Sequence, residues 1–282
     1  MNRLTSAARA AVLNCLIEGC SIRSTVRMTG VSKKAVSRLL VDAGKVAAEY
    51  QDRVMRDLPC RRIQVDELWG FCYCKQANLT AEIAASVPGA GSVWLWVAIC
   101  ADTKLVPCVT LGSRNASDAY VFMSDLAGRL NSRVQMTSDG HRPYLEAVEA
   151  AFGTEIDYAM LVKLYGSDPE GERRYSPPVC LGARPTVITG SPAPEHISTS
   201  YVERQNWTVR TTMRRYTRLS NGFSRKIENH MAAVAINYFA YNFIKIHRTL
   251  RVTPAMAAGV TDRLFDVSDL VALLVEAESK AA

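Results

Sequence analysis

The chain has 282 residues, of which 48% are apolar, a composition typical of one large or two smaller globular domains and not of a disordered protein. No run approaches the roughly 18 consecutive apolar residues of a membrane span, and the first residues lack the pattern of a secretory signal, so we expect a cytoplasmic protein without membrane contact. The net charge of +7 is unevenly distributed, because residues 1–50 carry +5, residues 197–251 carry +8 and the remainder carries −6. Two separate basic blocks on an acidic background favour an extended anion as partner, and they indicate DNA and a nucleoid-associated protein.

The first basic block predicts a helical DNA-binding domain over residues 1–50. Residues 5–19 have the apolar spacing of a helix, and residues 21–40 have that of two helices separated by Gly30, with Ser32 placed to cap the second. A helix, a glycine turn and a second helix form the helix-turn-helix pattern, although an ordinary helical hairpin with a solvated basic face has the same spacing. In such motifs the residues that open the second helix enter the major groove, and here these are Lys33, Lys34, Ser37 and Arg38. Residues 45–60 are expected to form a helical linker.

From residue 62 onward the period of the apolar residues changes to that of strands alternating with helices. The expected strands are residues 62–74, 92–102, 105–112, 134–140 and 156–166, and the expected helices between them are residues 117–130 and 144–153. This order predicts an α/β domain over residues 51–265, with an RNase H-like mixed five-stranded sheet and flanking helices. Residues 166–196, rich in Pro, Gly and charge, indicate an insertion or flap.

Two long helices are expected after this flap, in residues 197–218 and 224–247. A further short helix should begin at Pro254, with Thr253 as its cap. Residues 266–282 form the last expected element, a C-terminal helical tail that is a candidate contact for a partner.

Three carboxylates are candidates for a catalytic metal site. Asp66 interrupts an apolar strand, where an unpaired charge is costly, Asp139 ends a later strand, and Glu203 is the one acid among seven bases in residues 201–226. In an RNase H-like sheet these three places meet, so the acids could hold two divalent cations, Mg²⁺ or Mn²⁺, for attack on a phosphodiester. Each acid also has an ordinary alternative as a buried acceptor, a turn residue or a solvated helix residue. Glu67 is excluded from this site because adjacent strand residues point to opposite faces.

Four segments carry a resemblance to a known family, namely "VDELW", "TSDGHRPY", "ISTSYVERQNWTVRTTMRRYTRLSNGFSRKIENH" and "YNFIKIHRTLRVTPAMAAG". They resemble the transposases of the insertion sequence 1 family, which are bacterial DDE recombinases, over about residues 60–265. The resemblance implies an RNase H-like catalytic domain behind a DNA-binding N-terminus, with Asp66, Asp139 and Glu203 as the catalytic, metal-binding triad. It also implies that the protein binds the element's terminal inverted repeats, cleaves its ends and joins them to target DNA. Because two ends must be brought together, we expect a homodimer or higher oligomer on DNA.

The remaining candidate DNA contacts surround these acids. Arg210 lies about two helical turns from Glu203, on the same face, and the basic residues expected to hold phosphates are Arg204, Arg210 and Arg214. Asn206 and Trp207 are expected to touch the DNA end, where Trp207 would stack on a base or would instead pack in the core. His141 would orient a phosphate or a water, or would be a plain loop residue.

Two departures from the family, and two competing functions, stay open at this point. The eight cysteines form no CxxC pair, so the N-terminal zinc motif of the family's archetype is absent. The interval of 64 residues from Asp139 to Glu203 is longer than in many DDE enzymes, and the expected flap accounts for the excess. One alternative function is a catalytically inactive DNA-binding regulator of transposition, against which the retained acids count. The other is a nuclease that hydrolyses without joining, which would not need a separate DNA-reading domain.

Overall fold

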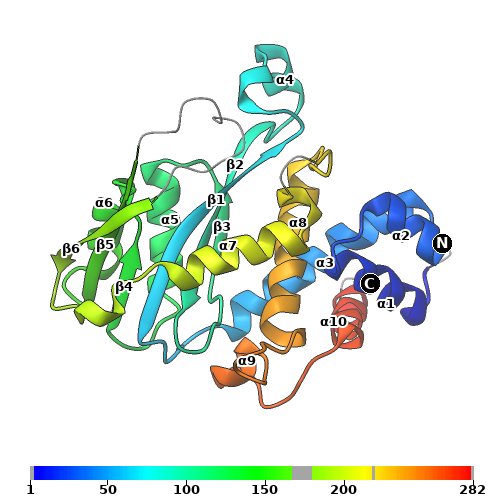
Figure 1. Ribbon diagram of the computed structural model, residues 1–282. Helices are drawn as coiled ribbons and strands as arrows, with labels where there is room; N and C mark the ends of the chain where they lie inside the picture. The colour runs from blue at the N-terminus through cyan, green and yellow to red at the C-terminus, as the bar shows by residue number, and fades with distance from the viewer. Residues whose placement is uncertain (1–2, 167–179, 218–219, 281–282) are drawn as a thin grey trace.

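The computed structural model describes residues 3–166, 180–217 and 220–280 of the chain. Within them the chain forms one mixed sheet in the order β3-β2-β1-β4-β5-β6 (Figure 1). The strands are β1 Arg62–Cys72, β2 Gly91–Cys100, β3 Val109–Gly112, β4 Val134–Ser138, β5 Ile156–Tyr165 and β6 Cys180–Thr189. The first three are antiparallel neighbours, β4 and β5 run parallel to β1, and β6 is antiparallel to β5. The α/β class and the five expected strands are confirmed, and the sheet is compatible with an RNase H-like fold.

The sheet has six strands rather than the expected five, because β6 forms inside the segment assigned to a flap. Within the part of the chain that the structure describes it is an edge strand, paired with β5, and Pro185 stands opposite Leu161 in its register. An edge strand tolerates proline because one of its sides donates to no neighbour, which is why the proline and glycine of this segment did not predict a strand. Residues 167–179, the earlier part of the expected flap, lie outside the described residues.

Helices cover both faces of the sheet (Figure 1). They are α1 Ser6–Ile17, α2 Ile22–Thr29, α3 Lys33–Val54, α4 Ala81–Ser86, α5 Ala116–Ala127, α6 Pro143–Phe152, α7 Ser200–Thr212, α8 Ile227–Phe239, α9 Pro254–Ala257 and α10 Val267–Lys280, with shorter turns η1 Gln76–Asn78, η2 Pro194–His196, η3 Arg214–Tyr216 and the π-helical η4 Ala240–Ile244. On one face α5 and α6 pack against β1, β2, β4 and β5, and on the other face α7 and α8 pack against β1 and β2. As expected, Thr253 caps α9, where its hydroxyl accepts from the Met256 amide at 3.3 Å.

The N-terminal helices lie where the sequence predicts them. Gly30 ends α2 with φ 69°, a left-handed conformation that glycine adopts without strain. Ser32 caps α3 by accepting a hydrogen bond from the Ala35 amide at 3.3 Å. The DNA-reading role of these helices stays a prediction, but their connection to the rest of the chain differs from a separate domain on a linker, because α3 runs unbroken across the expected boundary between residues 50 and 51.

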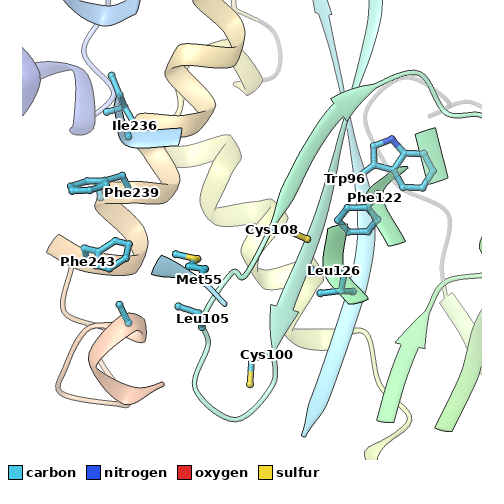
Figure 2. Close-up of a cluster of buried hydrophobic side chains, with 14 of the residues drawn as sticks. Met55, Trp96, Cys100, Leu105, Cys108, Phe122, Leu126, Ile236, Phe239 and Phe243 are labelled. Atoms are coloured by element: carbon cyan, nitrogen blue, oxygen red, sulfur yellow. The ribbon is translucent and has the colours of Figure 1, made fainter. Parts of the chain in front are cut away.

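One apolar core joins the N-terminal helices to the sheet. Figure 2 shows Met55, just beyond the end of α3, among buried side chains that reach from Phe239 and Phe243 to Trp96 on β2. A continuous set of buried side chains that joins the N-terminal helices to the sheet is typical of a single packed interior and not of two domains held by a flexible connection.

The C-terminal tail belongs to the same core. Helix α10 lies beside α1 and α3 (Figure 1), and Leu270, Val271 and Leu274 are buried there. Arg9 of α1 forms an ion pair with Glu278 at 3.0 Å. The apolar face that the sequence offered to a partner is therefore covered by the chain's own N-terminal helices.

Between β1 and β2 the chain forms an arm that the sequence did not predict. It contains η1 and α4 and stands at the far end of the two strands (Figure 1). Gly89 in this arm has φ 75°, and an added Cβ would meet the Ile227 side chain at 2.7 Å, so the arm lies against the start of α8. Among the described residues, no helix is long and apolar enough to cross a membrane.

Candidate active site

Strand register brings Asp66 and Asp139 to the same level of the sheet. β1 and β4 are parallel, with Gln64 opposite Thr137. Two residues further along each strand stand Asp66 and Asp139, the latter directly after β4 ends at Ser138. Carboxyl ends of parallel strands form one edge of a sheet, the edge where α/β proteins commonly bind ligands.

Asp66 is held in place by two donors. The side-chain amide of Asn206 donates to one carboxylate oxygen at 2.8 Å, and the Glu67 backbone N–H donates to the other at 2.8 Å. Burial, and after it the nearby negative charge of Asp139, raise the pKa of Asp66 to about 6. This position favours binding of a cation, because a positive charge would offset the repulsion between the Asp66 and Asp139 carboxylates.

Asn206 is not on the surface where the sequence placed it as a DNA contact. Its residue is 4% exposed, and its amide is directed at Asp66. Helical spacing could not tell which side of α7 faces the sheet, because both Asn206 and its neighbour Trp207 are compatible with either side. The described contact gives Asn206 the task of orienting a carboxylate.

Glu203 lies on α7 in the same cleft as the two aspartates. This cleft has a volume of about 740 Å³, and its lining includes Asp66, Asp139 and Glu203. The Glu203 carboxylate accepts hydrogen bonds from Lys163 of β5 at 2.5 Å and from the Thr199 hydroxyl at 2.5 Å. The three predicted acids therefore share one cleft, with Glu203 paired to a lysine.

Glu67, which the alternation rule excluded, lies in the acidic group after all. Asp66, Glu67 and Asp139 each offer one carboxylate oxygen, and these three oxygens lie within 4.8 Å of one another. The two β1 side chains do leave on opposite faces, but Asp139 stands beyond the end of β4, where the sheet no longer separates those faces. Burial, and after it the negative charge of Asp139, raise the pKa of Glu67 to about 7.

Arg114 contacts two acids of this group, Glu67 and Asp139. Its Nε donates to Glu67 Oε2 at 3.0 Å, and its terminal nitrogen lies 3.6 Å from Asp139 Oδ2. The other Glu67 oxygen, Oε1, is buried and makes no hydrogen bond of ordinary geometry in the described residues, although the Tyr144 hydroxyl lies close enough to Glu67 to lower the pKa of its carboxyl. A cation between the three carboxylates would give this oxygen a stronger partner.

The donor set fits a hard divalent cation. Carboxylate oxygens are the ligands that Mg²⁺ and Mn²⁺ prefer, and the three acids would be the protein ligands of one such ion. Glu203 is outside this group of three, so a second ion would draw on Glu203 across the cleft and would compete with Lys163 for it.

His141 supports Asp139 through its backbone. The His141 N–H donates to Asp139 Oδ1 at 2.9 Å, and the imidazole packs against the rings of Trp96 and Tyr144, each with centroids 5.8 Å away. Burial lowers the pKa of His141, and the positive charge of Arg114 lowers it further. The ring lines the cleft and packs against these two aromatic rings, so the geometry favours a supporting role for this residue.

The basic candidates of α7 and its continuation are not among the residues that line this cleft. Trp207 is 52% exposed, which excludes core packing for its ring, and the Arg204 guanidinium stacks on it at 4.2 Å. Arg214 is exposed in η3, whereas Arg210 is half-buried. At the start of α3, Lys33, Lys34 and Arg38 are exposed and Ser37 is half-buried.

Among the cleft residues that the sequence did not single out are two that pair with its acids, Arg114 and Lys163. Lys163 is a charge inside the apolar strand "IDYAMLVKLY", whose other charge, Asp157, stands at its start, so the reasoning applied to Asp66 could have found Lys163. Arg114 precedes α5 in an ordinary polar loop and carried no such signal.

Comparison with known proteins adds little to this geometry. No family model and no curated protein matches the chain. One solved structure that resembles it is the cryo-EM structure of the piggyBac transposase synaptic complex with hairpin DNA, at 9% sequence identity and a TM-score of 0.42, over 95% of this chain and 69% of that one. A likeness at this level assigns neither a family nor an activity.

Proposed function

We propose that the protein is a transposase of a bacterial insertion sequence, similar to the insertion sequence 1 family, which binds terminal inverted repeats and catalyses metal-dependent DNA cleavage and strand transfer. The observation that supports this most is the convergence of Asp66, Asp139 and Glu203 in one cleft, from β1, the end of β4 and α7. The cleft adjoins α7, whose exposed residues include Arg204 and the aromatic Tyr201 and Trp207, side chains that suit a polyanionic substrate.

The residues of the cleft divide into ligands and supports. Asp66 and Asp139, joined by Glu67 and Glu203, would hold Mg²⁺ or Mn²⁺, two ions in the full proposal. Such ions lower the pKa of an attacking water or 3′-hydroxyl and stabilise the leaving oxygen of a phosphodiester. Asn206 orients the Asp66 carboxylate through its 2.8 Å hydrogen bond.

The cationic side chains of the cleft complete this proposal. Lys163 and Arg114 would balance the acids and contact phosphate oxygens of the bound strand. In the same proposal the helix-turn-helix of residues 1–50 reads the terminal repeats, and a homodimer or higher oligomer brings two ends together at the nucleoid in the cytoplasm.

The test uses labelled DNA from the flanks of the protein's own reading frame, with Mg²⁺ or Mn²⁺. Wild type, Glu203→Gln and a control, Glu149→Gln on the exposed side of α6, are compared for 3′-end nicking and for joined products. We expect nicking and joining in wild type and the control, and DNA binding alone in Glu203→Gln. Full activity of Glu203→Gln would show that Glu203 does not belong to the catalytic site.

The remaining outcomes separate the competing functions. Binding of terminal DNA by wild type without nicking in either metal would favour the inactive regulator. Nicking without any joined product would favour the hydrolytic nuclease.

A further inference from the structure

We propose that four aromatic side chains on β1, β2 and the η3–α8 loop form a stacking surface for unpaired bases of a DNA strand that leaves the cleft. This aromatic row consists of Trp94, Trp69, Phe71 and Phe223. The inference rests on the proposed function and adds a substrate feature to it, namely a separated strand at the DNA end.

The aromatic row lies along the stretch of β1 and β2 that has few neighbouring strands. The pairing of β1 with β4 ends near the level of Asp66, and the pairing of β2 with β3 ends at Trp94, opposite Gly112. Beyond these points β1 and β2 pair with each other and run on toward the arm of α4 (Figure 1), and the other pairing of this stretch in the described residues is a single bridge between Cys72 and Ser224. The aromatic residues on this stretch are therefore only partly covered, and Trp69 is 40% exposed.

The rings are close enough to act as one surface. Trp69 stands directly opposite Trp94 in the β1–β2 register, which places the two side chains on the same face. The Trp69 and Phe71 ring centroids are 5.8 Å apart, and those of Phe71 and Phe223 are 5.0 Å apart, with interplanar angles of 34° and 33°. The Trp69 indole N–H donates to the Ser92 hydroxyl at 3.0 Å, so its ring is held in place with one side toward solvent.

Cations stand at both ends of the row. The Arg114 guanidinium carbon lies 5.0 Å from the centroid of Trp94, and the same side chain contacts Glu67 and Asp139 in the acidic cleft. At the other end, Phe223 is followed within three residues by Arg225 and Lys226, both exposed. A strand that passed from the cleft along the row would meet a guanidinium first, then aromatic rings, then two further positive charges.

This order of chemistry fits an unpaired nucleic acid strand better than an apolar protein segment. Every base has a flat face that stacks on an aromatic ring, and the phosphates between bases pair with Arg and Lys. A base inside a duplex offers no free face, so the surface would distinguish a frayed or separated end from a closed one. An apolar peptide would gain nothing from the flanking charges, because burying them without partners is costly.

The experiment measures the preference for an unpaired tail without any cleavage. Two fluorescein-labelled probes are compared by anisotropy in the absence of divalent metal, a blunt duplex and the same duplex with an oligothymidine tail. The variants are Trp69→Leu, which keeps an apolar side chain without a ring, and Trp69→Phe, which keeps a ring. The control is Tyr120→Leu, a similarly exposed aromatic residue on α5, 52% exposed.

Wild type, Trp69→Phe and Tyr120→Leu should favour the tailed probe, and Trp69→Leu should bind that probe at least about fivefold more weakly. All four proteins should bind the blunt duplex with the same affinity. Equal affinity of wild type for the two probes, or an unchanged preference in Trp69→Leu, would overturn the proposal. So would a loss in Trp69→Phe as large as that in Trp69→Leu.

These readouts are independent of the cleavage assay with Glu203→Gln. Absence of cleavage with a clear tail preference would contradict the transposase proposal while the stacking surface stands. Cleavage with no tail preference would contradict the stacking surface alone. Photo-crosslinking of a 5-bromouracil in the tail to the peptide that contains Trp69 would be expected as well, and crosslinking only elsewhere would count against the row.

Discussion

The contact between α3 and α8 is so close that one added methyl group should destabilise the protein. Gly44 lies in the middle of α3, and a Cβ there would stand 2.4 Å from both the Cα and the Cβ of Ala232 and 2.8 Å from its carbonyl oxygen. These atoms belong to the backbone and to a methyl group, so no side-chain rotation can relieve the overlap. To reach an ordinary contact of 3.4 Å, the two helices would have to move apart by about 1 Å.

The magnitude follows from two opposing terms. Overpacking of a well-packed interior costs about 1–3 kcal/mol, whereas alanine in place of glycine within a helix contributes up to about 1 kcal/mol of stability. The 2.4 Å overlap with backbone atoms places Gly44→Ala in the upper part of the first range, so we expect a net loss of about 1–2 kcal/mol in the free energy of unfolding. The loss would come from the surface that joins the N-terminal helices to the rest of the chain.

Urea unfolding followed by circular dichroism measures this loss, with Gly128→Ala as the matched control. Gly128 has an ordinary φ of −68°, and a Cβ there would meet nothing closer than 3.5 Å. The control should be neutral or more stable by about 0.4–1 kcal/mol. If Gly44→Ala were as stable as Gly128→Ala, the close packing of α3 on α8, and with it the fixed placement of the N-terminal helices, would be refuted.

Three further predictions concern the surface, the cleft and the core. Lys33→Ala combined with Lys34→Ala should weaken binding of terminal DNA while a pre-cleaved end is still joined once bound; unchanged affinity in a gel-shift titration would contradict the groove-reading role. Asn206→Ala should lower the cleavage rate about 10- to 100-fold with unchanged DNA affinity, because the β1 aspartate loses the donor that orients it; an unaffected rate would show that the contact is dispensable. Burial and the charge of Arg215 lower the pKa of His230 to about 4, so the unfolded chain binds the proton more tightly. Stability should therefore fall by about 3 kcal/mol as the pH drops from about 6.5 to 4, and this part of the slope should vanish in His230→Gln.

Much of the sheet could be predicted from the sequence because several strands can be recognised from the alternation of apolar residues within their own few positions. Alternating apolar residues predicted β1 and β2, and the charge of Asp66 within β1 marked the cleft before any contact was known. The placement of Asp139 followed from a strand that ends in "SDG", a place where the backbone can turn away.

What could not be predicted depends on contacts between distant segments. Alternation correctly sends Asp66 and Glu67 to opposite faces, but it says nothing about the strand beside them, and Asp139 at the end of β4 is what gathers both carboxylates. The pairing of Glu203 with Lys163 joins residues 40 positions apart. In the same way, α10 was a candidate partner contact until its packing on α1 and α3 was known, since an apolar helix face looks the same whether its own chain or another covers it.

The balance of charge in the cleft bears on the proposal that the protein cuts DNA, as against the alternative that it would only hold DNA. Burial and mutual repulsion raise the pKa values of Asp66 and Glu67, so placing these acids together opposes folding instead of assisting it. A surface that only held DNA phosphates would gain from removing these negative charges. The chain instead supports them with Arg114 and with the amide of Asn206. Such an arrangement is costly for a binding protein, but it is what a site needs to hold a cation against a phosphodiester.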